Sequence, residues 1–506
     1  MSTGSLLSEF LAAAAAALLA VGAAFTGAPG QVHETPTAVP GTVLTDDVAT
    51  ASATSTLTEA QLAEAIAAAL EEAPGTAHVS VRDAATGQEL YAQQADDAVA
   101  PASSLKVLTA ATALRALGPD TTLRTRTVLV DPGTPDPAVS PATSDPAVSP
   151  ATPTSSATPT SPASPTAPTP SPSPTPTTPT EVVLVGGGDV LLGTGDSDPN
   201  AVSGRAGLRT LAAETAQAMA DAKITGEVVV SVDLRLFEDD GRNPAWAADL
   251  YEAGYISPVQ PLATFGGRAE YGTGQERVED PAAQTALAFQ SELADAVESQ
   301  GGDLTVTVAD TVPATTQSRE AVLEAEPLGV VESASIEEQV GFMLAHSDNQ
   351  LAEALARVAA HALGRAATDQ GAASLMADMA VDLGAAQPAP QIADASGLAL
   401  GNRISVSQLT SVLTGAARSP QLSGVLDGLA APGTDSTLRE RLTGTAAESR
   451  VTAKTGTLLS AVSLTGRVTT EAGQELLFSI VLDQIDMDVS GARDAVDRVA
   501  VALAEL

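Results

Sequence analysis

Ser103 and Lys106 are the first two residues of this sequence whose types and spacing could carry out chemistry together. If a helix begins at Ser103, Lys106 lies one turn later on the same face. A serine hydroxyl needs an adjacent base to become a nucleophile, and a lysine whose pKa is lowered by burial or by a second cation can be that base. The N–H groups at the start of the helix would also stabilise an oxyanion. For this pair taken alone, an ordinary N-cap serine and a surface lysine are the alternative.

Lysine is scarce in this chain, which makes each lysine informative. The sequence has 21 arginines but only three lysines, at positions 106, 223 and 454. A guanidinium keeps its proton in proteins, whereas a buried ammonium can lose it, so lysine is needed where an amine must act as a base. We attribute Lys223 to chance and take Lys106 and Lys454 as candidates for chemistry.

A Ser-Asp-Asn turn at residues 347–349 provides the second candidate group, between two predicted helices. The Ser347 hydroxyl is suited to relay a proton to a leaving group, and the Asn349 amide can hold both Lys106 and a substrate carbonyl. The same tripeptide is also ordinary turn chemistry, in which Asp348 caps the following helix.

Lys454, Thr455 and Gly456 form the third group, on a predicted strand. A cation at position 454 helps to keep Lys106 neutral and, with the Thr455 hydroxyl, can bind a substrate carboxylate. Gly456 allows a substrate backbone to lie against the strand edge. We expect the Thr457 N–H to be the second oxyanion donor, beside the N–H of the candidate nucleophile.

The S-x-x-K, S-x-N and K-T-G motifs, in this order, resemble those of the serine penicillin-recognising enzymes. Further segments look like the D-alanyl-D-alanine carboxypeptidase/endopeptidase family, the low-molecular-mass class C penicillin-binding proteins. These segments are VVLVGGGDV (182–190), HSDNQLAEAL (346–355), DASGLALGNRIS (394–405) and AKTGTL (453–458). The spacing agrees, because 244 residues separate Ser103 from Ser347 and that family carries a large insertion between its first two motifs. The resemblance covers about residues 58–506, apart from 132–180.

The resemblance implies an α+β fold: a β-lactamase/transpeptidase-like domain, with an antiparallel sheet flanked by helices, and a large inserted domain between the first and second motifs. It also implies cleavage of peptidoglycan stem peptides that end in D-Ala–D-Ala, through an acyl-enzyme, and covalent inhibition by β-lactam antibiotics. By motif, Ser103 is the nucleophile and Lys106 the base, while Ser347, Asn349 and Lys454 complete the catalytic set. No cofactor is expected.

Some residues near these motifs are left outside the predicted site. Val190 and Ala395 depart from the family pattern, and we expect them to change only local loop geometry. Asp394 and Ser396 suit a turn as well as a cleft, and Trp246 is expected to anchor the inserted domain rather than to stack on a substrate.

Other activities stay open on the same motifs. A β-lactamase or an esterase could use the same fold, although no E-x-x-L-N segment lies between the first two motifs to activate a deacylating water. Carboxypeptidase and endopeptidase cleavage are both compatible with the motifs. A non-catalytic cell-wall-associated protein is the alternative from another class, suggested by a Pro/Thr/Ser-rich tract and by the strong acidity.

The overall charge and the missing residue types exclude several classes of function. Lys and Arg total 24 against 62 Asp and Glu, which gives a formal net charge of −38 and disfavours nucleic-acid binding. The chain has no cysteine, so disulfides, thiolate nucleophiles and Cys-based metal sites are excluded. Four histidines without HxxxH-type spacing give no sign of a metal site.

The N-terminal segment has the length of an export signal. Residues 10–25 are apolar, which fits a signal-peptide core better than a membrane span of about 20 residues, although no Lys or Arg precedes them. We expect residues 1–30 to be a signal peptide or N-terminal anchor and residues 31–55 to be a flexible tether. The protein is then extracytoplasmic, either secreted or associated with the cell envelope.

Residues 132–180 consist almost entirely of Pro, Thr, Ser and Ala and hold 16 of the 33 prolines. This composition buries too little apolar surface to fold, so we predict a disordered loop. Strand patterns on both sides place the loop within an inserted domain at residues 122–281. The transpeptidase-like domain is then formed by residues 56–121 and 282–506.

Hydrophobic periodicity predicts the elements that must position the three motifs. Helices are predicted at residues 58–72, 103–117, 281–301, 337–346, 350–363 and 490–505. Strands are predicted at residues 77–83, 89–93, 123–131, 181–185, 227–231, 304–309, 451–454, 461–468 and 475–482. The alternating pattern near the C-terminus indicates the antiparallel sheet that carries the third motif.

Overall fold

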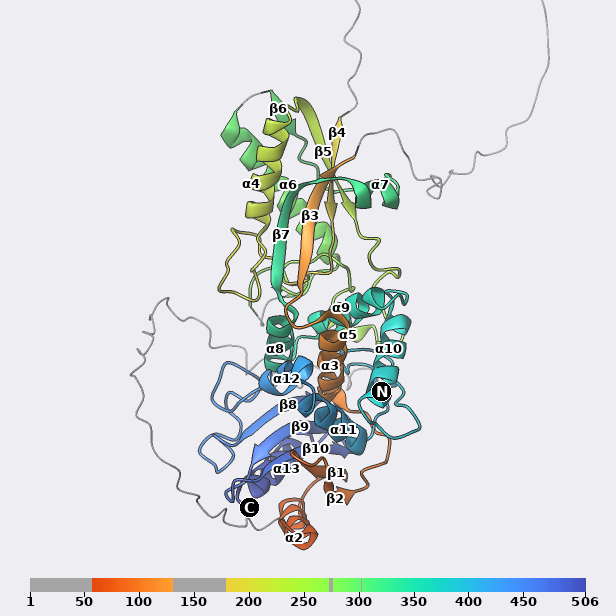
Figure 1. The fold of residues 1–506 in the computed structure, drawn as a ribbon, viewed down its shortest axis with the longest axis vertical. Helices are drawn as coiled ribbons and strands as arrows, with labels where there is room; N and C mark the ends of the chain where they lie inside the picture. Colours follow the sequence, from red (N-terminus) through yellow and green to blue (C-terminus); the bar gives the residue numbers. More distant parts are fainter. Residues whose placement is uncertain (1–56, 131–178, 273–275, 302) are drawn as a thin grey trace, which may run out of the picture.

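The structure, a computed structural model, describes four segments of the 506-residue chain: residues 57–130, 179–272, 276–301 and 303–506. Within these segments, two five-stranded sheets lie at opposite ends of the molecule and a layer of helices lies between them (Figure 1). The α+β class predicted from the sequence is confirmed. The expected leader, the tether and nearly all of the Pro/Thr/Ser-rich tract lie outside the described residues.

The first sheet joins the two ends of the described chain. It contains β1 (Thr76–Asp83), β2 (Glu89–Gln93), β8 (Val451–Thr457), β9 (Ala461–Thr469) and β10 (Glu475–Asp483). The strand order is β2-β1-β10-β9-β8, and every pairing is antiparallel. β8, which carries the third motif, is therefore an edge strand.

Helices cover both faces of the first sheet because its central strands are apolar on both sides. On β10, Leu476, Phe478 and Ile480 share a core cluster with the C-terminal helix, whereas Leu477 packs into the helical layer on the other face. This is the alternation of a strand with two buried faces. The covering helices are α2 (Glu59–Ala69) and α13 (Val489–Ala504) on one face and α11 (Val406–Ala417) on the other.

The helical layer contains the first and second motifs. Its elements are η1 (Ala102–Leu105), α3 (Lys106–Leu117), α8 (Ile336–His346), α9 (Asn349–Ala362), α10 (Asp369–Asp382), η2 (Pro420–Leu422) and α12 (Ser423–Asp427), together with α11. α3 runs through the centre of this layer and packs against α8, α9, α10 and α11. Because α3 is surrounded, residues 106–114 are all buried, and the lysine at its start is removed from water.

The second sheet lies within the region between the first two motifs. It contains β3 (Thr122–Leu129), β4 (Thr180–Val185), β5 (Gly226–Asp233), β6 (Leu304–Val306) and β7 (Pro327–Ser335), in the order β6-β5-β4-β3-β7. The pairs β4–β5 and β5–β6 are parallel, so this sheet is mixed. β7 pairs with β3, so the sheet draws in residues beyond 281, where the sequence suggested a return to the first domain. We call residues 122–335 the inserted region.

The helices of the inserted region cover its sheet and reach toward the helical layer. They are α4 (Leu208–Asp221), α5 (Asp249–Glu252), α6 (Pro281–Gln300) and α7 (Arg319–Glu324). Side chains of α4 and α6 form one apolar core with β4 and β5, while α7 packs on the opposite face against Val128 and Val183. In the part of the chain that the structure describes, no helix combines the length and apolar character needed to cross a membrane.

Candidate active site

The backbone around Ser103 is held in an unusual conformation. Ala102, the residue before it, has a φ of 49°, in the left-handed region. Gly397 packs directly on Ala102, because a Cβ at Gly397 would lie 2.0 Å from the Ala102 carbonyl oxygen. Ser103 is the second residue of the 3₁₀ turn η1, and Lys106 begins α3. The predicted one-turn spacing therefore holds, although the first turn is 3₁₀ rather than α-helical.

The Lys106 amine contacts all the groups that a base at this position needs. Its Nζ lies 3.1 Å from Ser103 Oγ, 2.7 Å from Asn349 Oδ1 and 2.6 Å from the Ser396 carbonyl oxygen. The amide oxygen and the carbonyl oxygen can only accept, so they take two of the amine hydrogens. The remaining tetrahedral position faces the Ser103 hydroxyl, and in a neutral amine that position holds the lone pair.

The second motif forms the junction between α8 and α9. Ser347 ends α8 in the left-handed conformation with a φ of 58°, and Asp348 is the N-cap of α9, as the sequence predicted. The Asn349 amide donates to the Tyr255 carbonyl oxygen at 3.0 Å, which leaves its own oxygen turned to Lys106. Ser347 lies half-buried in the same turn, directly before the two residues that have these contacts.

Arginines of the inserted region control the charge at the second motif. Arg268 Nη1 lies 3.0 Å from Asp348 Oδ2, and Arg277 donates to the carbonyl oxygens of Gly254 and Gly266. These two cations overcome the effect of burial, which alone would raise the pKa of Asp348, and lower that pKa to about 2. Asp348 is therefore ionised throughout the range in which the protein is expected to work.

The third motif lies directly against the first. A Cβ at Gly456 would lie 2.9 Å from the Ser103 nitrogen and 2.1 Å from Ser463 Oγ. Ser463 Oγ in turn lies 2.8 Å from Ser104 Oγ and donates to the Pro101 carbonyl oxygen at 2.7 Å. These contacts fix η1 on β8, and they leave no space for a side chain at position 456.

The pairing of β8 shows where its free N–H groups point. The Leu458 N–H donates to β9, whereas the Ala453 N–H points the other way and donates to the Ala430 carbonyl oxygen at 2.9 Å. N–H groups alternate between the two sides of an antiparallel strand, so those of Thr455 and Thr457 point to the free edge. The Thr457 N–H, expected to be an oxyanion donor, therefore lies on the unpaired side of β8.

Burial is the main cause of a lowered pKa at both lysines of the candidate site. Burial lowers the pKa of Lys106 to about 8, and the charges of Asp394, Asp348 and Glu353 oppose that effect. Burial lowers the pKa of Lys454 well below its usual range, and the positive charge of Lys106 lowers it further. The sequence led us to expect Lys454 to lower the pKa of Lys106, whereas the charge effect found between the two amines is that of Lys106 on Lys454.

Sequence reasoning missed the segment 394–397, which lies against the Lys106 amine. The Ser396 contact with Lys106 is made by a backbone carbonyl, which leaves no signature in a side-chain pattern. Asp394 accepts from the Trp246 indole at 2.8 Å, so Trp246 is an anchor of the inserted region, as predicted. The available signal was the likeness of residues 394–405 to a family segment. Among the described residues, no cluster of His, Asp and Glu is arranged to bind a metal.

The fold is that of the penicillin-binding proteins. Penicillin-binding protein 4 (dacB) from Haemophilus influenzae superimposes with a TM-score of 0.58 over 86% of this chain and 97% of its own, at 15% identity. A structure of that protein in complex with a β-lactam gives a TM-score of 0.51 at 16% identity, with the same coverage. The transpeptidase-like fold class predicted from the sequence is confirmed.

Sequence comparison narrows this class to one family. Carboxypeptidase DacB from Mycolicibacterium smegmatis is 28% identical over 96% of this chain and 94% of its own length. A carboxypeptidase from Mycobacterium tuberculosis is 27% identical over 82% of this chain and 78% of its own. The chain belongs to the D-Ala-D-Ala carboxypeptidase 3 (S13) family, whose model matches residues 59–150 and 273–506. The family and the enzyme class predicted from the sequence are confirmed.

Proposed function

We propose that this carboxypeptidase cleaves the terminal D-Ala–D-Ala bond of peptidoglycan stem peptides through an acyl-enzyme on Ser103. The observation that carries the proposal is the set of contacts around Lys106, in which two acceptors hold the amine and the third position faces Ser103 Oγ at 3.1 Å. A neutral lysine held in this way is arranged to take the hydroxyl proton.

Acylation then follows from the positions of the remaining groups. The Ser103 oxygen attacks the carbonyl carbon of the penultimate D-Ala, and its proton passes to Lys106. The N–H groups of Ser103 and Thr457 stabilise the oxyanion. When the C–N bond breaks, the departing amine receives a proton through the Ser347 hydroxyl and leaves as D-Ala. Water later hydrolyses the ester and restores Ser103.

Substrate binding would also prepare the base. The terminal carboxylate of the peptide is bound by Lys454 and Thr455, and a carboxylate beside Lys454 favours the charged form of that amine. A charged Lys454 disfavours a proton on Lys106, because the two buried amines affect each other. Binding of the correct substrate therefore shifts the proton from Lys106 toward Lys454 and leaves the base free.

A mass measurement after exposure to benzylpenicillin tests this proposal. The wild-type protein is expected to gain one penicilloyl group, mapped to the peptide that contains Ser103. Ser103→Ala should lose the adduct and lower D-Ala release from a synthetic peptide by at least about 10³-fold while the protein stays folded. Ser374→Ala, on the surface of α10, is the matched control and should behave as wild type. A folded wild-type protein without an adduct, or with one at another residue, would contradict the proposal.

The lifetime of the adduct separates the peptidase from a β-lactamase. We expect the penicilloyl group to remain on the protein for hours and β-lactams to act as covalent inhibitors; the H. influenzae neighbour has been seen in complex with a β-lactam. Rapid loss of the adduct, with many turnovers of penicillin, would favour β-lactam hydrolysis. Release of D-Ala from the monomeric peptide, compared with cleavage of a cross-linked dimer, distinguishes carboxypeptidase from endopeptidase activity.

The proposed substrate also places the protein outside the cytoplasm. Cross-linked cell wall lies beyond the membrane, and the apolar run at residues 10–25 has the length of an export signal. Fractionation of cells that produce the full chain should place it in the envelope or in the medium. Recovery in the cytoplasm alone would contradict this assignment.

A further inference from the structure

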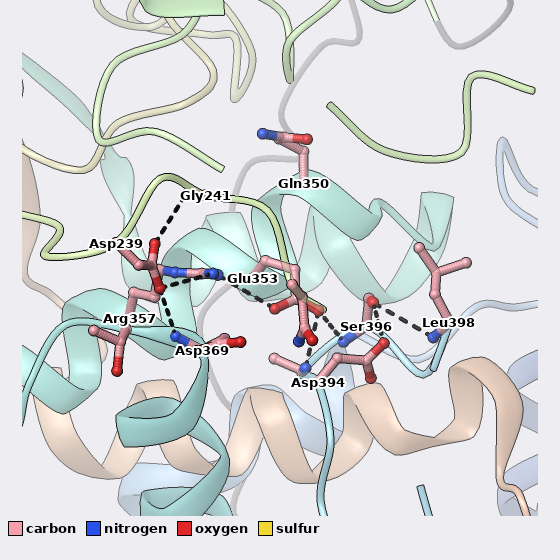
Figure 2. Close-up of polar contacts among 12 residues, drawn as sticks. Asp239, Gly241, Gln350, Glu353, Arg357, Asp369, Asp394, Ser396 and Leu398 are labelled. Carbon is pink, nitrogen blue, oxygen red and sulfur yellow. Dashed lines mark hydrogen bonds and ion pairs between the residues drawn. The ribbon is translucent and has the colours of Figure 1, made fainter. Parts of the chain in front are cut away.

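We propose that Glu353 is a positioning residue for the base: it holds the backbone of residues 395–396 so that the Ser396 carbonyl stays on the Lys106 amine. The proposal rests on the proposed function, because it assumes that Lys106 activates Ser103. Glu353 lies on α9, one turn after the Ser-Asp-Asn motif, and its side chain reaches across to the segment that follows Asp394 (Figure 2).

Glu353 and Asp394 between them fix the two peptide units around Ser396. Glu353 Oε1 accepts from the Ala395 N–H at 2.9 Å and from the Ser396 N–H at 2.8 Å. Asp394 Oδ1 accepts from the Gly397 N–H at 2.8 Å, on the peptide unit that carries the Ser396 carbonyl. That carbonyl then meets Lys106 Nζ at 2.6 Å. The direction of one acceptor of the base is thus set by two buried carboxylates.

A chain of ion pairs orients Glu353 from the opposite side. Arg357, fully buried, lies with Nη1 3.4 Å from Glu353 Oε2 and Nη2 3.4 Å from Asp239 Oδ2. Asp239, in the inserted region, also accepts from the N–H groups of Gly241 and Asp369 (Figure 2). Because Arg357 binds one oxygen of Glu353, the other oxygen is left for the backbone of residues 395–396.

The energetics of Glu353 argue against a purely structural role. It is 1% exposed, and burial followed by the charge of Asp394 raises its pKa to about 7, although Arg357 opposes this. When folding raises the pKa of a carboxyl, the folded protein loses stability as the pH rises from the ordinary pKa of that group through the raised value. An apolar residue would avoid that cost. Two hydrogen bonds connect Glu353 to Lys106, one from the Ser396 N–H to Glu353 and one from Lys106 to the Ser396 carbonyl. A buried acid at such a position indicates a role in function.

Glu353 also affects the base through its charge. Asp394, Asp348 and Glu353 raise the pKa of Lys106, Arg277 lowers it, and the Lys454 amine is coupled to Lys106 by charge. Removal of the Glu353 charge should therefore lower the pKa of Lys106. The rising limb of acylation against pH would then move to lower pH, even while the loss of positioning lowers the maximal rate.

The test measures penicillin acylation against pH for Glu353→Gln and for the double variant with Arg357→Met. The amide keeps the shape of Glu353 without its charge, and the second change removes the arginine that would otherwise face the amide nitrogen. We expect the maximal rate to fall about ten- to a hundredfold and the rising limb to move to lower pH, with the adduct still on Ser103.

Gln339→Met is the control, because Gln339 is a buried polar residue of α8 that donates to Ser333 Oγ and the Ala334 carbonyl oxygen. This variant should have a lower free energy of unfolding. Its maximal rate of penicillin acylation and the rising limb of its pH profile should be those of the wild type. Folded Glu353 variants that keep the wild-type rate, or that lose rate without movement of the limb, would overturn the proposal. A wild-type protein that is not acylated at Ser103 would instead overturn the proposed function itself.

Discussion

The first sheet and the inserted region both contact elements that carry the candidate site, but they contribute different groups to it. The first sheet carries the groups that we propose to bind a substrate: the Lys454 amine, the Thr455 hydroxyl and the outward N–H groups of β8. The inserted region supplies contacts to residues that hold the base. Tyr255 binds Asn349, and Trp246 binds Asp394.

This difference separates two kinds of mutational effect. A change on β8 should alter the position of the reacting atoms directly, because a Cβ at Gly456 would lie 2.9 Å from the Ser103 nitrogen. A change in the inserted region acts through Asn349 or residues 394–397. It should lower the rate of acylation without abolishing the reaction. The comparison therefore predicts a graded series of effects.

The largest effect is expected at the contact between β8 and η1. Gly456→Ala would place a methyl group 2.9 Å from the Ser103 nitrogen, so η1 must move away from β8. We expect penicillin acylation to slow by about 10²- to 10³-fold, as for loss of an oxyanion donor. Gly195→Ala, in the inserted region, meets only the end of Arg209 at 4.0 Å and should keep the wild-type rate. Equal acylation rates for Gly456→Ala and Gly195→Ala would contradict the expected difference between β8 and the inserted region.

A smaller effect is expected at the anchor of the inserted region. Trp246→Phe removes the indole N–H that donates to the buried Asp394 carboxylate, and should lower the free energy of unfolding by about 1–3 kcal/mol. Acylation should slow by roughly tenfold as residues 394–397 loosen.

The neighbouring Tyr251 offers the matched control. Its buried hydroxyl has no hydrogen-bond partner among the described residues. Tyr251→Phe should therefore change neither the free energy of unfolding nor the rate of acylation. Thermal unfolding and stopped-flow acylation of both variants check this pair. A Trp246→Phe variant as active and stable as wild type would show that the anchor is dispensable.

The Asp348–Arg268 contact predicts a stability effect that depends on pH. Folding lowers the pKa of Asp348 to about 2, so its stabilising contribution is present above the unfolded pKa and is lost as the pH falls from about 4 toward 2. Asp348→Asn should therefore be less stable than wild type by about 2 kcal/mol at pH 6, with the difference disappearing at low pH.

Urea unfolding between pH 6 and pH 2.5 measures this difference. Asp378→Asn removes an exposed partner of Arg365 and serves as the control, with a change below about 1 kcal/mol. Parallel stability curves for Asp348→Asn and the wild type would show that the carboxylate does not gain its partners on folding.

The smallest effect is expected from deletion of residues 131–178. These residues connect β3 to β4, whose paired ends include Leu129 and Val182, at the end of the inserted region remote from the helical layer (Figure 1). A short Asn-Gly turn can join two such antiparallel strands. D-Ala release from a soluble peptide should stay within about twofold of wild type. A large loss of activity would give the tract a role in catalysis.

The sequence predicted the elements that have strong local signals. The helix at 58–72 appears as α2, with the Thr58–Gln61 capping box, and the three C-terminal strands appear as β8, β9 and β10. Sequence reasoning missed β7, the long helices α4, α10 and α11, and the short helices α5, α7 and α12. β7 gains its place through pairing with β3, about 200 residues away in sequence, which no local pattern reports.

The residues of the candidate site likewise fall into those that the sequence predicted and those that it did not. The three motifs were visible because each is a short run of side chains, and the structure brings Ser103, Lys106 and Asn349 into direct contact. The Ser396 carbonyl and the carboxylates that hold it were not visible. Their role depends on tertiary contacts between α3, α9 and residues 394–397, and on a backbone atom that every residue type provides.

The Ala430–Ala453 bridge has a consequence for the length of peptide that β8 can receive. Ala430 already occupies the outward N–H of Ala453, so only Thr455 and Thr457 remain on that edge to receive an added strand. An added strand can therefore form ladder bonds with this edge over a short length only. A peptide that uses this edge must therefore be held mainly by groups other than a long ladder of backbone hydrogen bonds.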